Sequence, residues 1–240
     1  MTGPRFLTVG DCALSVEFGD TVDPTTNARV LALDKALGTD LPEGVIELVP
    51  TYRALMIHFD PLTTSLAALR KTVEQMVVKT GADDALGRLW RVPVGYGGDL
   101  GIDLADLAAR HGLTEEQVVE IHANATYRVY MIGFAPGFCY LGGLPEALHT
   151  PRRIEPRLVT PAGTVSIGGA QAAVTSVPVP SGWHLIGRTP LKTFDPDGDP
   201  VFLFHPGDQV RFERISAGDW HTLSGRVERG EFRPTPEDDA

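Results

Sequence analysis

The sequence has little cysteine and no long apolar run, and both absences narrow the class of protein. Its 240 residues include two cysteines, Cys12 and Cys139, which lie far apart and outside any C-x-x-C pair. This spacing predicts neither a disulfide framework nor a zinc site. No apolar run approaches the ~20 residues that span a membrane, and the N-terminus lacks the apolar core of a signal peptide. We therefore expect a cytoplasmic protein with no membrane partner.

Positive charge is also scarce. The formal net charge is −10, from 31 acidic and 21 basic side chains. Affinity for a phosphate backbone depends on clustered lysines and arginines. The composition therefore argues against a nucleic-acid partner.

Several catalytic and nucleotide-binding motifs are missing. The sequence contains no G-x-x-x-x-G-K-[ST], no Rossmann fingerprint, no H-E-x-x-H and no G-x-S-x-G. A P-loop nucleotide site and the common hydrolase motifs are thus excluded. The seven histidines show no ligand spacing, so we expect no metal site.

Apolar periodicity in residues 1–84 predicts a small α+β domain. Alternating patterns indicate two strand pairs, and each pair is followed by an amphipathic helix. Asp23 followed by Pro24 is typical of a helix start, and Thr63 or Thr64 is the expected cap of the second helix. We expect an antiparallel sheet with both helices on one face. The four strands are predicted at 6–9, 13–18, 45–49 and 54–59.

Residues 80–84 form the predicted linker, and residues 85–216 form a second domain of different character. A strand at 89–94 precedes two helices, at 103–111 and from the capping box at Thr114. Eleven of the 19 prolines then fall between residues 131 and 210, which predicts short strands separated by turns. A closed barrel would leave these strands no exposed edge. Further strands are predicted at 127–132, 164–167, 172–176, 183–186, 201–204 and 209–215, and a loosely ordered polar tail at 217–240.

Arginines in the second domain are the first candidates for a functional site. Arg152 and Arg157 each follow a proline, and Arg188 lies in the phrase G-R-T-P. A guanidinium group offers a planar fork that matches carboxylate or phosphate. We predict a catalytic or anion-holding role for all three, although for Arg152 and Arg157 pairing with Glu146 or Glu155 is an equal alternative. For Arg153 we favour that structural alternative.

His122 is the fourth catalytic candidate. It lies near the end of a predicted helix, close in sequence to Tyr127. Its imidazole can act as an acid or base near neutral pH. A structural role at the helix C-terminus, where the dipole favours a cation, is the preferred alternative.

Aromatic and glycine residues of the same region are candidates for substrate binding. Phe134, Tyr140 and Trp183, together with Phe138, either fill the barrel or form a pocket floor. The amide of Gln171 suits a lactam or a carboxamide. Gly137 and Gly163 belong to Gly- and Pro-rich phrases that specify loop shape, and shaped loops often carry binding sites.

These phrases also carry a family resemblance. They read G-F-A-P-G-F-C-Y-L-G-G-L-P, P-R-R-I-E-P-R, T-P-A-G-T-V-S-I-G-G-A-Q and G-W-H-L-I-G-R-T-P. They resemble the allophanate hydrolase subunit 1 family, which includes the B subunit of bacterial ATP-dependent 5-oxoprolinase and an inhibitor of a sporulation sensor histidine kinase. The resemblance extends to about residue 216. It implies a small α+β N-terminal domain and a cyclophilin-like β-barrel.

The resemblance further implies partners and a reaction. Similar proteins pair with a subunit 2 protein, also called the C subunit, as in the carboxyltransferase part of urea carboxylase. With a third subunit, the 5-oxoprolinase pair converts 5-oxo-L-proline to L-glutamate with ATP hydrolysis, so the ATP would be held by the complex. Three alternatives stay open: inhibition of a histidine kinase at its dimerisation domain, another amide or urea-derivative hydrolase or carboxyltransferase, and, less favoured, prolyl isomerase activity.

Two segments depart from the family pattern. Thr160 stands where the family usually has the valine of V-P-A-G. After Gln171 the family usually reads T-G-I-Y-P, whereas this chain reads A-A-V-T-S. If the missing groups contact the substrate, either the substrate differs or activity is lost.

Overall fold

The computed structural model describes residues 3–79 and 87–237. The chain forms two compact units, Met1–Ala85 and Leu86–Ala240. The predicted linker at 80–84 lies outside the described residues. Across the described ranges, no helix is both long and apolar enough to cross a membrane.

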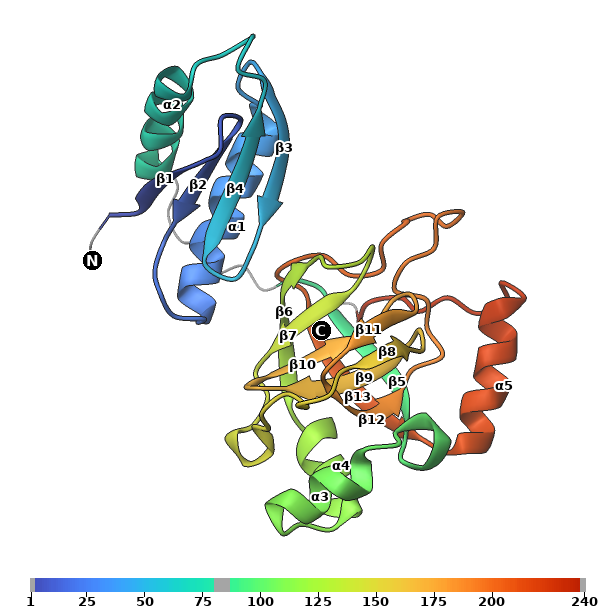
Figure 1. Cartoon of the computed structure of the whole chain (residues 1–240). Coiled ribbons are helices and arrows are strands. Elements are labelled where there is room, and N and C mark those ends of the chain that lie inside the picture. Colours follow the sequence, from blue (N-terminus) through green and yellow to red (C-terminus); the bar gives the residue numbers. More distant parts are fainter. Residues whose placement is uncertain (1–2, 80–86, 238–240) are drawn as a thin grey trace. The chain divides into compact units, whose positions relative to one another are not determined.

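The first unit is an antiparallel sheet packed against two helices, as the periodicity predicted (Figure 1). Asp23 caps the first helix by accepting a hydrogen bond from Thr26 N at 2.9 Å. The second helix begins after Ser65, whose hydroxyl accepts from Ala68 N, so Ser65 rather than Thr63 or Thr64 is its cap. The sheet order is β1-β2-β4-β3, and the elements are β1 (Arg5–Val9), β2 (Ala13–Glu17), α1 (Pro24–Thr39), β3 (Val45–Pro50), β4 (Ala54–Phe59) and α2 (Leu66–Lys79).

The second unit is built on a closed barrel, so the predicted α+β class with a barrel is confirmed. Within the described residues seven strands close it in the order β10-β7-β6-β13-β5-β12-β9, and only β13 and β5 pair in parallel. Two further short strands, β8 (Arg157–Thr160) and β11 (Val179–Ser181), pair with each other outside the barrel order. The barrel strands are β5 (Leu89–Tyr96), β6 (Thr126–Ile132), β7 (Cys139–Gly142), β9 (Thr164–Gly168), β10 (Gln171–Val174), β12 (His184–Arg188) and β13 (Gln209–Ile215).

The second unit also contains helices outside the barrel strands (Figure 1). They are the 3-10 turn η1 (Gly98–Leu100), α3 (Leu104–His111), α4 (Glu115–Ala123), the 3-10 turn η2 (Glu146–Leu148) and α5 (Ala217–Glu228). The predicted capping box is present, because the Thr114 hydroxyl accepts from Gln117 N while the Gln117 side chain accepts from Thr114 N.

Two predictions for the second unit are wrong. Residues 201–204 form no strand and make only an isolated bridge between Phe194 and Phe202; their apolar run instead buries Leu203 and Phe204 in the barrel core. The tail is not loosely ordered over 217–228, which is helix α5. Trp220 and Val227 bury one face of that helix.

A buried carboxylate joins three parts of the barrel unit. Asp103, just before α3, is 3% exposed. Its Oδ2 accepts from Leu185 N on β12 at 2.8 Å, and its own N donates to Leu185 O at 2.9 Å. Its Oδ1 accepts from Arg157 on β8 at 2.5 Å and from Arg153 at 3.4 Å. One side chain therefore holds the start of α3, strand β12 and the segment that leads into β8.

We expect Asp103→Asn to destabilise the barrel unit by about 3 kcal/mol, because removing one partner of a buried ion pair leaves the other charge uncompensated. All three tryptophans lie in the second unit, so tryptophan fluorescence during urea unfolding reports that unit. Asp106→Asn, an exposed position in the first turn of α3, is the matched control and should change stability by less than about 0.5 kcal/mol. Equal midpoints for the two variants would contradict the role of Asp103.

His122 lies inside the barrel core. It is 0% exposed and stacks on Phe212 at 4.7 Å between ring centroids. Its Nδ1 is 2.9 Å from the Tyr96 hydroxyl, and its Nε2 is buried without a hydrogen-bond partner among the described residues. Burial lowers the pKa of His122 to about 3, so the ring is neutral and does not act as a cation for the helix dipole.

This burial predicts an acid-sensitive fold. Between about pH 6.5 and pH 3 the unfolded chain binds a proton at His122 and the folded chain does not, so stability falls as the pH falls through that window. The slope is at most about 1.4 kcal/mol per pH unit. We expect His122→Phe to flatten the pH dependence of the unfolding free energy between pH 6 and pH 4, measured by urea titration. An unchanged slope would show that His122 is protonated in the folded state.

Candidate functional site

The aromatic candidates gather at one cavity of about 420 Å³ on the barrel unit. Phe134, Tyr140, Arg152 and Trp183 all line it, and so does Phe138. We call it the aromatic cavity. The structure thus brings together four of the predicted site residues from three separate parts of the sequence.

Strand alternation explains why these rings face the outside of the barrel. On β7, Cys139 and Leu141 enter the barrel core, whereas Tyr140, and Phe138 directly before the strand, pack in a separate cluster on the other side, because side chains alternate along a strand. Phe138 packs on Phe134 at 5.5 Å and on Tyr140 at 4.7 Å between centroids. The row continues to Trp183, whose centroid is 6.1 Å from that of Tyr140.

Gly168 and Ser181 determine the position of Trp183. A Cβ added at Gly168 of β9 would lie 2.4 Å from the indole ring, so only glycine allows this close approach. The Ser181 hydroxyl accepts from Trp183 N at 3.1 Å and fixes the turn before β12. The indole is therefore a rigid wall of the cavity.

Phe134 is held in a conformation that side chains rarely adopt. Its φ is +68°, and the residue is 65% exposed. Two hydrogen bonds fix the surrounding loop: the Thr193 hydroxyl donates to Gly137 O at 3.1 Å, and the Ser176 hydroxyl donates to Pro136 O. This strained, exposed conformation keeps Phe134 as a candidate for a functional role.

Arg152 is a cation that lines the aromatic cavity. Its guanidinium carbon lies 5.5 Å from the Trp183 ring centroid, and the side chain makes no ion pair with another described residue. Burial raises the pKa of the nearby Tyr140 hydroxyl, with the charge of Arg152 acting in the opposite direction. The cavity thus combines apolar ring faces, a protonated phenol and an available positive charge.

The other two arginine candidates contact the protein itself. Arg157 forms an ion pair with Asp103. Its predicted pairing with Glu146 or Glu155 is therefore not the one observed. Arg188 donates from Nε to Ala162 O at 2.7 Å and lies over the Trp220 ring at 5.1 Å, and burial lowers its pKa. Neither side chain lines the aromatic cavity.

The remaining candidates are dispersed. Gly163 N donates to Thr175 O and Gly163 O accepts from Thr189 N, near Arg188. Gln171 pairs with Gly168 at the start of β10 but does not line the cavity. Gly137 belongs to the same loop as Phe134, whereas His122 is enclosed in the core. Among the described residues, no group of three potential metal ligands comes together.

Some lining residues escaped sequence reasoning. Arg153 and Ile154 line the aromatic cavity, and Arg153 also approaches Asp103. Asp103 was recognised only as a helix start, because nothing in its local sequence indicates an arginine fifty residues away. The run of two arginines between Pro151 and Pro156 was the available signal, but it did not show which side chain faces which side.

Comparison with known proteins identifies the family. The family model for the carboxyltransferase domain, subdomain C and D, matches residues 4–204. The chain is 42% identical over 213 residues to the 5-oxoprolinase B subunit of Escherichia coli O157:H7, covering 88% of this chain and 96% of that protein. It is 36% identical over 224 residues to the 5-oxoprolinase B subunit of Bacillus subtilis, covering 89% and 93%.

Solved structures agree with this assignment. One solved relative is 35% identical, with a TM-score of 0.77 over 85% of this chain, which spans 40% of that longer protein. The urea carboxylase of Kluyveromyces lactis is 19% identical with a TM-score of 0.81; it covers 98% of this chain, which spans 24% of the enzyme, and it shows the shared fold alone. From the matched family model and the near full-length relatives, we conclude that the chain belongs to the family of carboxyltransferase domains, subdomain C and D.

Proposed function

We propose that this chain is the B subunit of an ATP-dependent 5-oxoprolinase, which converts 5-oxo-L-proline to L-glutamate. The observation that carries the proposal is the match, over nearly their whole length, to two proteins of that name. The aromatic cavity, with its available guanidinium, supports it chemically.

The cavity suits a small cyclic acid. The flat lactam ring of 5-oxoproline would pack on the faces of Trp183 and Phe138, where apolar contact and ring geometry favour it. Its carboxylate would pair with Arg152 in a charge-assisted hydrogen bond. Tyr140 would donate its hydroxyl proton to the lactam carbonyl, since burial keeps the phenol protonated.

The complete reaction needs partners. We propose that a subunit 2 protein (the C subunit) and a third subunit join this chain, and that the complex holds ATP, because the sequence contains no P-loop. We keep Arg157, Arg188, Gly163, Gln171 and His122 out of the proposed site, since they lie in ion pairs, backbone contacts or the core. The named relatives give no support to the histidine-kinase alternative.

We expect Arg152→Gln to raise the KM for 5-oxoproline roughly 10- to 100-fold, because a hydrogen bond to a charged group contributes about 1.5–3 kcal/mol. The measurement is 5-oxoproline-dependent ATP hydrolysis by the chain co-expressed with its partner subunits. Arg211→Gln, an exposed arginine on β13, removes the same charge elsewhere and should leave KM unchanged. Wild-type KM in the Arg152 variant would remove this residue from the site.

Phe134→Gly separates function from stability. Glycine tolerates a φ of +68°, so we expect the free energy of unfolding to stay equal or to rise by up to about 1 kcal/mol. Loss of the exposed ring should nevertheless lower turnover in the same assay. A variant that is less stable but fully active would show that Phe134 serves packing only.

A further inference from the structure

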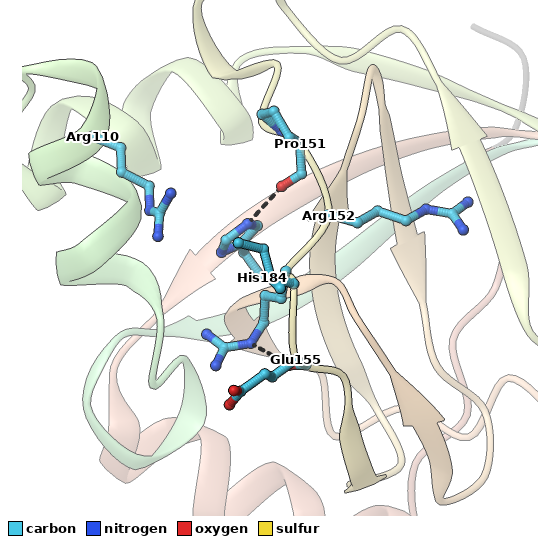
Figure 2. A pocket seen from close by; sticks show the side chains of 7 residues that line it. Arg110, Pro151, Arg152, Glu155 and His184 are labelled. Carbon is cyan, nitrogen blue, oxygen red and sulfur yellow. Dashed lines mark hydrogen bonds between the residues drawn. The ribbon is translucent and has the colours of Figure 1, made fainter.

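A second cavity lies across the segment 151–155 from the aromatic cavity, and the proposed function does not use it. Its volume is about 430 Å³, and it is lined by Arg110 at the end of α3, His184 on β12, Arg153 and Glu155 (Figure 2). We call it the arginine cavity. Arg152, Arg153 and Ile154 line both cavities.

The arginine cavity concentrates positive charge on a protein whose net charge is −10. In Figure 2 the guanidinium of Arg110 points toward the imidazole of His184, and Arg110 has no ion pair within the described ranges. The contacts of the Arg153 side chain to Asp103 and to Glu155 O are both 3.4 Å long. Arg152 lines the cavity too, but its side chain points away, toward Trp183.

Nearby negative charges do not cancel these groups. Asp103 already accepts the closer hydrogen bond from Arg157, at 2.5 Å, and the backbone N–H of Leu185. Glu155 is exposed and makes no ion pair with a described residue. Two guanidinium groups therefore face one solvated carboxylate, which leaves the cavity cationic.

His184 adds an unused hydrogen-bonding atom. It is 2% exposed, and its Nε2 lies 2.9 Å from Pro151 O. Because a carbonyl oxygen can only accept, Nε2 is the donor in this contact, and the imidazole tautomer with its proton on Nε2 has a lone pair at Nδ1. That Nδ1 is buried and has no partner among the described residues. Leaving a buried acceptor unpaired costs about 1–3 kcal/mol, so this atom favours a ligand that donates a proton.

We propose that the arginine cavity binds a small oxyanion that retains a hydroxyl group, such as hydrogenphosphate, between Arg110 and Arg153, with its hydroxyl donating to His184 Nδ1. Guanidinium forks match the spacing of oxyanion oxygens. Because Nδ1 is out of contact with solvent, a lining side chain must shift for the hydroxyl to reach it. The side chain of Arg153, whose polar contacts are both 3.4 Å long, is one lining group that can shift.

The test is calorimetric titration of the full chain with inorganic phosphate at about pH 8 and fixed ionic strength. We expect saturable binding of one phosphate, and binding of sulfate weaker by at least roughly fivefold, since sulfate lacks the hydroxyl that Nδ1 would accept. A second titration uses hydrogencarbonate, which also carries a hydroxyl. Comparing its affinity with that of phosphate shows which oxyanion the cavity prefers. The proposal would be overturned if neither phosphate nor hydrogencarbonate bound saturably, or if sulfate bound as tightly as phosphate.

Two variants locate the site. Arg110→Gln should weaken phosphate binding by at least roughly tenfold, the loss expected for one charge-assisted hydrogen bond. Arg211→Gln removes the same charge from an exposed position on β13 that lines neither cavity, and it should bind phosphate like the wild type. If the two substitutions weakened phosphate binding equally, the binding would reflect the general positive charge of the surface and not this cavity. Binding by the chain alone is independent of the 5-oxoprolinase assay, so either proposal can fail while the other holds.

Discussion

The buried carboxylate of Asp103 is the constraint on which the surface around the two cavities depends. A carboxylate removed from water must be paired, and Asp103 is paired with Arg157 and with the backbone of Leu185. These contacts fix the segment before β8 against β12. Arg153 N also donates to Gly182 O at 2.7 Å, so the segment between the two cavities is held at Arg153 as well as at Arg157.

Neighbouring arginines of this segment serve different purposes. Arg157 neutralises a buried charge, Arg152 lies over Trp183, and Arg153 borders both cavities. Their chemistry is identical, and their roles follow only from the direction that the backbone gives each side chain. Prolines at 151 and 156 restrict that backbone, which keeps the three directions distinct.

The sequence predicted the structural elements that depend on contacts between neighbouring residues, such as helix caps and alternating strands. The cap at Asp23 and the capping box at Thr114 depend on atoms within three residues, and the alternation of β5, β6 and β13 follows from burial on one side. Strands β7, β8 and β11 were not predicted, because they are short and lie within Gly- and Pro-rich phrases. Helix α5 was missed because Trp220 and Val227 are its only buried residues.

For the site, sequence reasoning found the aromatic residues but not their grouping. Phe134, Tyr140 and Trp183 were candidates either for the barrel interior or for a pocket, and only the register of β7 decides between these alternatives. Since Cys139 and Leu141 take the interior positions, Tyr140 and Phe138 must face outward. Asp103 and His184 gave no signal, because their partners, Arg157 and Pro151 O, are distant in sequence.

The barrel explains how a strained loop can persist beside the aromatic cavity. A φ of +68° at Phe134 costs of order 1–3 kcal/mol, which the loop alone cannot offset. Hydrogen bonds from Thr193 and Ser176 tie the loop to neighbouring segments, and the next residues enter β7, whose alternate side chains fill the core. A Cβ at Gly137 would lie 2.6 Å from Phe194, so the loop also needs glycine at that position. The closed sheet thus supplies the rigidity, and the Gly-Phe-Ala-Pro-Gly-Phe phrase uses it to hold an aromatic ring in solvent.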